Sequence, residues 1–338
     1  MRTVLHIGLP KTGSTSIQEN FTLHHDTLRG HGILFPLVEG RFLHPFHVRR
    51  VLLAGDIESL RQPAHREVKA VETLREIERA VALKPDVLFL SSEDIAAKFE
   101  AFDVLKRNMD GFSDDTRVLA YFRDPVSYYR SMVQHHVKSQ SDFPPLAAWD
   151  STFLKICERG KAVFGDAFRP VATNKGALRR GSIVDDALGH CLDDPSESLS
   201  IDTTRNNSSS SSAVSVVLQD FMLQHQKGVK QYGRRNTQLR KTLETHARKS
   251  GLSSRATLKD GAEEAILAHS RDELLALRDA HGLVFDAVDY DALATCKAFG
   301  AFQGCTRISD VFEVDDAAVA ELKAVANEFL KSYDLTVQ

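Results

Sequence analysis

The chain has 338 residues, of which 42% are apolar and 26% are charged, as expected for one large or two smaller globular domains and not for a disordered protein. Its 43 basic and 46 acidic side chains give a formal net charge of −3. This balance argues against a protein that coats nucleic acid or acidic membranes, although it leaves room for a local basic pocket. No apolar run approaches the ~20 residues that span a bilayer.

The N-terminal residues and the cysteines indicate a cytoplasmic protein. The chain runs from Met1 directly into a motif, which leaves no room for a signal peptide. The four cysteines are scattered with no CxxC pair, at Cys157, Cys191, Cys296 and Cys305. We therefore expect reduced thiols, with neither a disulfide framework nor a zinc site.

Strand-like and helix-like segments alternate along the first half of the chain. Short apolar segments predict strands at 3–7, 32–36, 86–90 and 117–122. Helical spacing predicts helices at 14–28, 57–83, 99–112 and 125–138. Strands that alternate with helices indicate an α/β fold, with a parallel sheet that carries helices on both faces.

The second half of the chain is richer in helical segments. We expect a strand at 168–172 and helices at 149–163, 183–191, 214–226, 262–281 and 317–333. A segment at 227–255 is rich in Lys, Arg and Gln and predicts a solvated helical region. No linker divides the chain, so we expect a single domain with an α/β nucleotide-binding core at 1–175 and a mainly helical elaboration at 176–338.

The strongest chemical signal joins the first predicted strand to the first predicted helix. Residues 6–16 read His-Ile-Gly-Leu-Pro-Lys-Thr-Gly-Ser-Thr-Ser. Gly8 and Gly13 keep the spacing of the Walker A pattern, but Ser14 stands at its lysine position and the lysine lies earlier, at Lys11. Because the amides and the dipole of a helix start attract phosphate, this loop predicts an anion site. The displaced lysine disfavours an ATPase or a GTPase.

A second motif follows the strand at 117–122. Arg123 ends the strand, Asp124 and Pro125 open a helix, and Ser131 lies eight residues after Arg123. An arginine at the carboxyl edge of a sheet can form two hydrogen bonds with a phosphate, and a serine two turns into the next helix can add another. The motif therefore predicts a second phosphate-binding group.

Together these motifs resemble sulfotransferases that use 3′-phosphoadenosine 5′-phosphosulfate (PAPS). Residues 10–15 resemble the 5′-phosphosulfate loop of that family, and 118–131 resemble its 3′-phosphate motif. The chain lacks the glycine-rich Arg-Lys-Gly segment of the cytosolic animal branch, so it is closer to the bacterial and carbohydrate-type branch. The run at 205–208 resembles an Asn/Ser-rich stretch of bacterial members, although a helix cap or a linker explains it equally well.

The resemblance implies a three-layer P-loop-type fold and in-line transfer of a sulfuryl group from PAPS to an acceptor hydroxyl. Lys11 would stabilise the oxygen that bridges phosphorus and sulfur. The 5′-phosphate would bind at Thr12, Gly13, Ser14, Thr15 and Ser16. Arg123 and Ser131 would bind the 3′-phosphate. The scheme needs no metal, and the two adjacent histidine pairs, His24-His25 and His135-His136, are poorly placed to chelate one.

Two segments offer a general base for the acceptor. Glu93 follows the third predicted strand and should lie at the active edge of the sheet. His44 and His47 follow the second predicted strand, where carbohydrate-modifying relatives often place their base, and Glu39 lies just before them. A carboxylate serves as a base if burial raises its pKa. A helix cap, an ion pair or a packing role explains each residue as well.

Two other functions stay open. A small-molecule kinase with a P-loop should bind ATP with Mg²⁺ and should not need a 3′-phosphate pocket. A non-catalytic protein on the same fold could bind the nucleotide without transferring sulfate. The acceptor is expected to be a small molecule or a carbohydrate, and its identity stays open because variable loops shape that pocket. We expect no nucleic acid polymer as a partner and no integral membrane segment, and the oligomeric state is open.

Overall fold

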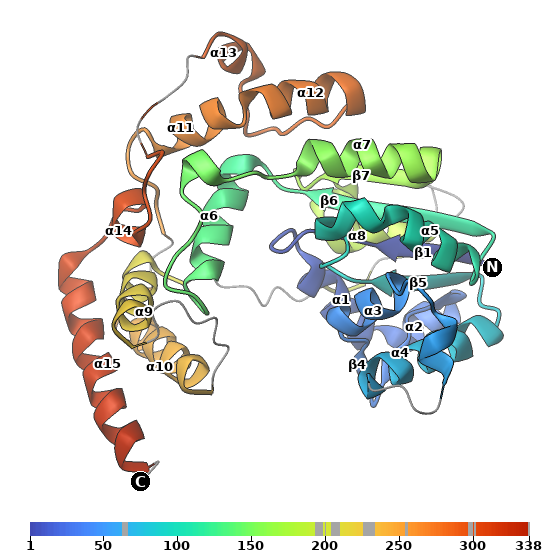
Figure 1. Ribbon diagram of the computed structural model, residues 1–338, viewed down its shortest axis with the longest axis horizontal. Helices are drawn as coiled ribbons and strands as arrows, with labels where there is room; N and C mark the ends of the chain where they lie inside the picture. The colour runs from blue at the N-terminus through green and yellow to red at the C-terminus, as the bar shows by residue number, and fades with distance from the viewer. Residues whose placement is uncertain are drawn as a thin grey trace. The chain divides into compact units, whose positions relative to one another are not determined.

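The computed structural model in Figure 1 describes residues 1–62, 67–192, 199, 201–203, 210–225, 234–253, 256–296, 300 and 302–336. They form two compact units that interleave along the chain. The first unit comprises Met1–Asp124, Thr152–Asn206 and Glu273–Asp289. The second comprises Pro125–Ser151, Asn207–Asp272 and Tyr290–Gln338. The expectation of a single domain, divided at residue 175, stays a prediction.

A five-stranded parallel sheet forms the centre of the first unit (Figure 1). Its order is β2-β5-β1-β6-β7. The strands are β1 (Arg2–His6), β2 (Ile33–Leu34), β5 (Val87–Ser91), β6 (Asp115–Phe122) and β7 (Phe168–Ala172). Helices cover both faces, so the predicted α/β class with a parallel sheet is confirmed. The bounds of each strand lie within two residues of the predicted ones, because a strand buried on both faces reads as a short continuous apolar run.

Seven helices in the described part of the first unit surround the sheet. They are α1 (Ser14–Leu23), α2 (His25–Gly30), α3 (Pro45–Leu52), α4 (Val68–Ala82), α5 (Phe102–Asp110), α7 (Phe153–Phe164) and α8 (Ile183–Gly189). On one face, α1 packs against α8. On the other face, α7 packs against α5, and the ring of Phe153 meets that of Phe122 with the ring centroids 5.3 Å apart.

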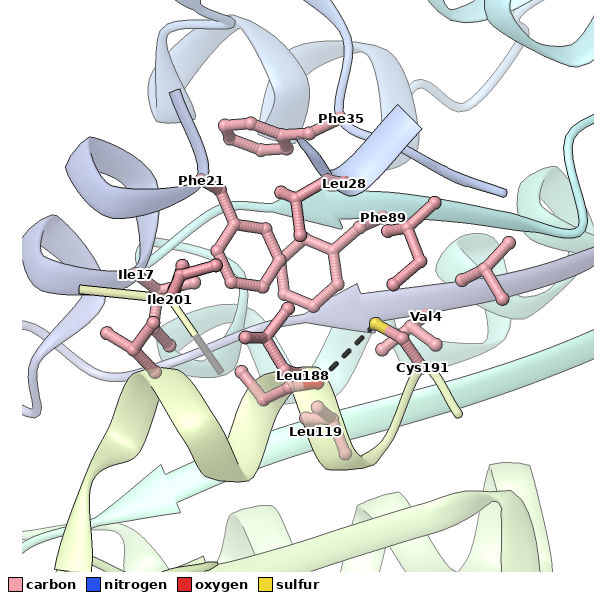
Figure 2. Packing of buried hydrophobic residues seen from close by; sticks show 14 of the residues in the cluster. Val4, Ile17, Phe21, Leu28, Phe35, Phe89, Leu119, Leu188, Cys191 and Ile201 are labelled. Atoms are coloured by element: carbon pink, nitrogen blue, oxygen red, sulfur yellow. Dashed lines mark hydrogen bonds between the residues drawn. The ribbon is translucent and has the colours of Figure 1, made fainter. Parts of the chain in front are cut away.

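An apolar cluster joins the sheet to α1 and α8. Figure 2 shows Phe21 and Phe89 within it, and their ring centroids are 4.5 Å apart. Leu188 of α8 and Leu119 of β6 belong to the same cluster. The Cys191 thiol donates a 3.4 Å hydrogen bond to the carbonyl of Ala187 (Figure 2). This packing fixes α8 over the same strands that lead to the loop between β1 and α1.

A buried hydrogen bond between β6 and α8 adds to the apolar packing of these two elements. The Tyr121 hydroxyl donates a 2.7 Å hydrogen bond to the Asp186 carboxylate of α8. The Arg179 amide donates to the same carboxylate at 3.1 Å, and His190 Nε2 lies 3.4 Å from it. Burial alone would raise the pKa of Asp186, but these hydrogen bonds outweigh it and hold the pKa below its ordinary value. Folding therefore favours the ionised carboxylate.

The second unit is helical, apart from an isolated β-bridge between Leu258 and Phe312 in its described part. Its helices are α6 (Pro125–His136), α9 (Ser212–His225), α10 (Arg234–Lys249), α11 (Ala262–His269), α13 (Tyr290–Thr295), α14 (Ile308–Val311) and α15 (Asp316–Thr336). Helices α9, α10 and α15 share one apolar cluster. The helix α12 (Arg271–His281) includes residues of both units. No helix in the described stretches is long and apolar enough to cross a membrane.

Three predicted helices are broken in the structure. The helix expected at 14–28 changes direction at His24, and the one at 262–281 is interrupted at Ser270. The helix expected at 57–83 begins only at α4, after a 3₁₀ turn at Glu58–Arg61. Gln62 is extended there because the following residue is a proline, which disfavours helical backbone before it. Helix α10 covers much of 227–255, whereas 205–208 lie outside the described residues.

A short hairpin is among the elements that were not predicted, as are helices α3, α13 and α14. Strands β3 (Leu37–Val38) and β4 (Arg41–Phe42) pair as a hairpin whose two turn residues, Glu39 and Gly40, have positive φ angles. Such a turn matches the twist of the strands but requires left-handed backbone at both residues. Glutamate rarely adopts this conformation, so its presence does not indicate a turn. The third helix, α3, begins just after this hairpin.

The contact between Tyr121 and Asp186 gives a stability prediction. Tyr121→Phe should lower the free energy of unfolding at neutral pH by about 1–3 kcal/mol, because it removes a donor from a buried carboxylate. The depressed pKa of Asp186 contributes stability above its unfolded value, and this contribution is lost as the pH falls through the folded value. The cost of the substitution should therefore shrink in acid. Urea titrations across pH measure this, with Phe122→Leu as a control whose cost should not depend on pH.

Candidate functional site

The connection between β1 and α1 is a tight loop with unusual backbone angles. Lys11 has a φ of 68° and Gly13 a φ of 104°, both in the left-handed region. The Thr12 hydroxyl donates a 2.7 Å hydrogen bond to the carbonyl of Leu9, which closes the loop on itself. No described side chain caps the start of α1. The first amides of a helix have no partner within the helix, so here they are suited to hold an anion.

Glycine is required at two positions of this loop. A β-carbon on Gly8 would stand 2.4 Å from His6 Nε2 and 2.8 Å from Ser14 Oγ. A β-carbon on Gly13 would stand 2.8 Å from Ile183 Cδ1 of α8, in addition to the strain of its φ angle. The two glycines of the Walker-like spacing therefore let the backbone lie close to His6 and Ser14 at Gly8, and close to Ile183 at Gly13.

Arg123, the first residue after β6, contacts the loop. Its Nη1 donates a long, 3.4 Å hydrogen bond to the carbonyl of Lys11. Since β1 and β6 are parallel neighbours, their carboxyl ends share one edge of the sheet. The structure thus brings together the two motifs that the sequence singles out. Ser131 lies on α6 in the second unit, so its predicted partnership with Arg123 stays a prediction.

Glu93 lies at the same edge. It follows β5, and the turn that carries it is tied to the loop by two backbone hydrogen bonds, from Ser92 to His6 at 2.9 Å and from Ala96 to Ile7 at 3.2 Å. Burial raises the pKa of Glu93, the charge of Asp94 raises it further, and the charge of Lys11 opposes the change. The carboxylate and the ammonium are therefore electrostatic neighbours.

The two candidate histidines lie at the start of α3. His44 Nδ1 accepts a 3.3 Å hydrogen bond from the Phe46 amide, so His44 caps this helix. The rings of His44 and His47 have centroids 5.3 Å apart. Burial lowers the pKa of His47, and the charges of His44, Lys69 and Arg50 lower it further. Its charged neighbours thus include residues of α3 and α4.

Helix α3 is attached to the turn that carries Glu93. The Ser92 hydroxyl donates a 2.8 Å hydrogen bond to the carbonyl of Pro45, and Arg49 lies 3.5 Å from the Asp94 carboxylate. Glu39, in contrast, is exposed at the tip of the hairpin between β3 and β4. The pKa of Glu93 thus responds to the charge of Lys11, whereas Glu39 is exposed at the tip of a hairpin.

His6 is a residue of this site to which the sequence alone assigned no role. It ends β1 directly beneath the loop and is fully buried. Its Nδ1 lies 2.9 Å from Ser91 Oγ, which also accepts a 3.0 Å hydrogen bond from Gln18 Nε2. Burial lowers the pKa of His6 to about 3, so the ring is neutral in ordinary conditions. A histidine that ends an apolar strand just before a glycine loop is the signal that could have identified it.

No group of three or more His, Cys, Asp or Glu side chains in the described part of the chain could hold a metal ion. No protein-family model matches the chain, and neither a curated protein nor a solved structure matches it. The residues of this site are therefore the basis on which a function can be inferred.

The contact at Gly13 gives a prediction for the loop. Gly13→Ala should lower the free energy of unfolding by about 1–3 kcal/mol, because the added carbon meets Ile183 and alanine is strained at this φ. Thermal or urea unfolding measures the loss. Gly30→Ala is the matched control, since a β-carbon there would meet no described atom within 4 Å. Equal stability of the two variants would contradict the loop conformation.

Proposed function

We propose that the chain is a PAPS-dependent sulfotransferase of the P-loop type, which transfers a sulfuryl group to an acceptor hydroxyl by in-line displacement. The observation that carries this proposal is the hydrogen bond from Arg123 to the carbonyl of Lys11. It joins two motifs that lie 112 positions apart and that each predict a phosphate-binding group. PAPS carries two such phosphates, at the 5′ and 3′ positions of its ribose.

The residues of the loop fit the 5′ side of this donor. The uncapped start of α1 offers backbone amides to the phosphate, and Gly8 and Gly13 let the backbone come close. Lys11 supplies the positive charge that the leaving oxygen needs when its bond to sulfur breaks. Arg123 supplies a planar pair of donors for the 3′-phosphate, with Ser131 as its proposed partner.

The acceptor side needs a group that takes the proton. As the acceptor oxygen forms its bond to sulfur and the bridging oxygen leaves with the electron pair, the hydroxyl proton passes to a base. Glu93 is our choice, because burial raises its pKa and its charge interacts with that of Lys11. His44 is the weaker choice, since its Nδ1 already caps α3. A carbohydrate hydroxyl stays the acceptor that the resemblance favours.

Nucleotide binding tests the proposal. Calorimetry should show that 3′,5′-adenosine diphosphate binds at least about tenfold more tightly than AMP, because a phosphate held by arginine forms charge-assisted hydrogen bonds. Arg123→Ala should remove most of this preference. Arg117→Ala is the control, since Arg117 lies on the same strand but donates to the carbonyl of His190. Preference for ATP with Mg²⁺ would favour a kinase, and absence of nucleotide binding would overturn the proposal.

The base can be tested by substitution. Glu93→Gln should lower kcat by about 10²–10⁴-fold without weakening nucleotide binding, because the amide cannot take the proton. With the native chain, kcat should rise with pH through a midpoint above the ordinary glutamate value of 4.5, since the base must be ionised and its pKa is raised. The assay follows transfer from radiolabelled PAPS to a panel of sugars, alcohols and phenols.

A histidine base could give a similar pH profile, because the pKa of His47 is lowered from 6.5. Variants of each residue distinguish a glutamate base from a histidine base. His47→Asn should keep most of the activity that Glu93→Gln loses, and the reverse pattern would make His47 the base.

A further inference from the structure

The ring of His6 is enclosed beneath the proposed anion loop. On its Nδ1 side lies Ser91 Oγ at 2.9 Å, and the ring centroid of Tyr121 is 5.5 Å from its own. The side chain has no exposed surface. A neutral imidazole carries one proton, on either Nδ1 or Nε2, and the neighbours of the ring decide which nitrogen holds it.

The contacts of Ser91 favour the proton on Nε2. Gln18 Nε2 donates to Ser91 Oγ at 3.0 Å, which uses one of the lone pairs of that oxygen. The hydroxyl hydrogen of Ser91 then needs an acceptor, and among the described residues His6 Nδ1 is the one placed to accept it. An Nδ1 that accepts a hydrogen bond carries no proton, so the proton lies on Nε2.

Two buried polar atoms then face the same small space. His6 Nε2 and Ser14 Oγ both lack a hydrogen-bond partner among the residues that the structure describes, so they do not yet bond to each other. Both lie within 3 Å of the point where a β-carbon on Gly8 would stand. One of them is a donor and the other can accept, and a buried polar atom without a partner is costly. The absence of a side chain at Gly8 leaves room for them to meet.

We propose that His6 is a positioning residue of the anion loop: when the anion binds, its Nε2–H donates to Ser14 Oγ beneath Gly8 and so directs the Ser14 hydroxyl hydrogen toward a phosphate or sulfate oxygen. This inference rests on the proposed function for the nature of the anion. The chain of donors runs from Gln18 to Ser91, His6 and Ser14 and ends at the ligand. Ser14 stands where a Walker A loop has lysine, so a hydroxyl oriented by a neutral ring acts at that position.

The arrangement excludes a proton-transfer role for His6. The ring is fully buried, so it does not touch the acceptor. Its low pKa keeps it neutral, which suits a fixed donor and not a residue that exchanges protons during turnover.

Nitrogen NMR of the full chain tests the tautomer directly. With ¹⁵N-labelled histidine, long-range proton–nitrogen spectra distinguish a protonated Nε2 from a protonated Nδ1 for each of the 14 histidines. His6 is assigned as the signal that disappears in His6→Gln. We expect the Nε2–H form, unchanged between pH 5 and pH 9, and a shift of its signal when 3′,5′-adenosine diphosphate or inorganic sulfate is added. A protonated Nδ1, or a signal that does not respond to either anion, would overturn the inference.

Substitutions test the role of the donor. In His6→Gln the amide nitrogen can stand where Nε2 stood, whereas the shorter amide of His6→Asn reaches only the place of Nδ1 and leaves no donor at the place of Nε2. His6→Gln should bind 3′,5′-adenosine diphosphate within about threefold of the native affinity, and His6→Asn should bind about tenfold more weakly, as expected for one lost hydrogen bond. Equal losses in both would overturn the positioning role. His31→Asn, at an exposed histidine of the same unit, is the control.

A double-mutant cycle separates positioning from folding. Ser14→Ala and His6→Asn remove the two ends of one hydrogen bond, so the second change should add little to the loss of affinity caused by the first. Additive losses would contradict a contact between them. If the native chain binds no nucleotide, the proposed function fails, while the tautomer and its response to inorganic sulfate still decide this inference.

Discussion

The close approach of the backbone to buried polar groups at Gly8 is the constraint on which the site depends. A side chain there would collide with His6 and Ser14, the groups beneath the loop. Gly13 imposes a second limit, because its backbone is left-handed and lies against Ile183. The loop conformation, and with it the uncapped start of α1, is therefore determined by the absence of side chains as much as by the residues present.

Parallel pairing of β5, β1 and β6 then brings the chemistry together. Because these strands run in the same direction, Glu93, the loop and Arg123 all follow strand ends at one edge of the sheet. Helix α8 is held to β6 by Tyr121 and Asp186, and its first residue, Ile183, lies next to Gly13. The apolar cluster shown in Figure 2 thus supports the position of the loop as well as the stability of the fold.

Much of this arrangement could be predicted from the sequence, and the reason differs between elements. The strands could be found because burial on both faces requires continuous apolar runs. The loop and Arg123 could be paired because each follows a strand, and ligands of an α/β sheet bind at the carboxyl ends of its strands. The helix breaks at His24 and Ser270 could not be found, since neither residue is a strong breaker. The buried network of Gln18, Ser91 and His6 depends on tertiary contacts between separate elements, which no local pattern encodes.

The opposing influences on Glu93 link donor binding to the strength of the base. Burial and Asp94 raise the pKa of Glu93, and the ammonium of Lys11 works against them. In the proposed reaction the same ammonium faces the anionic donor, whose charge offsets that of Lys11. A bound donor thus weakens the effect of Lys11, which lowers the pKa of Glu93, while burial and Asp94 still raise it. A carboxylate in this position becomes a better proton acceptor when the sulfuryl donor is bound, at the stage of the reaction in which a base is needed.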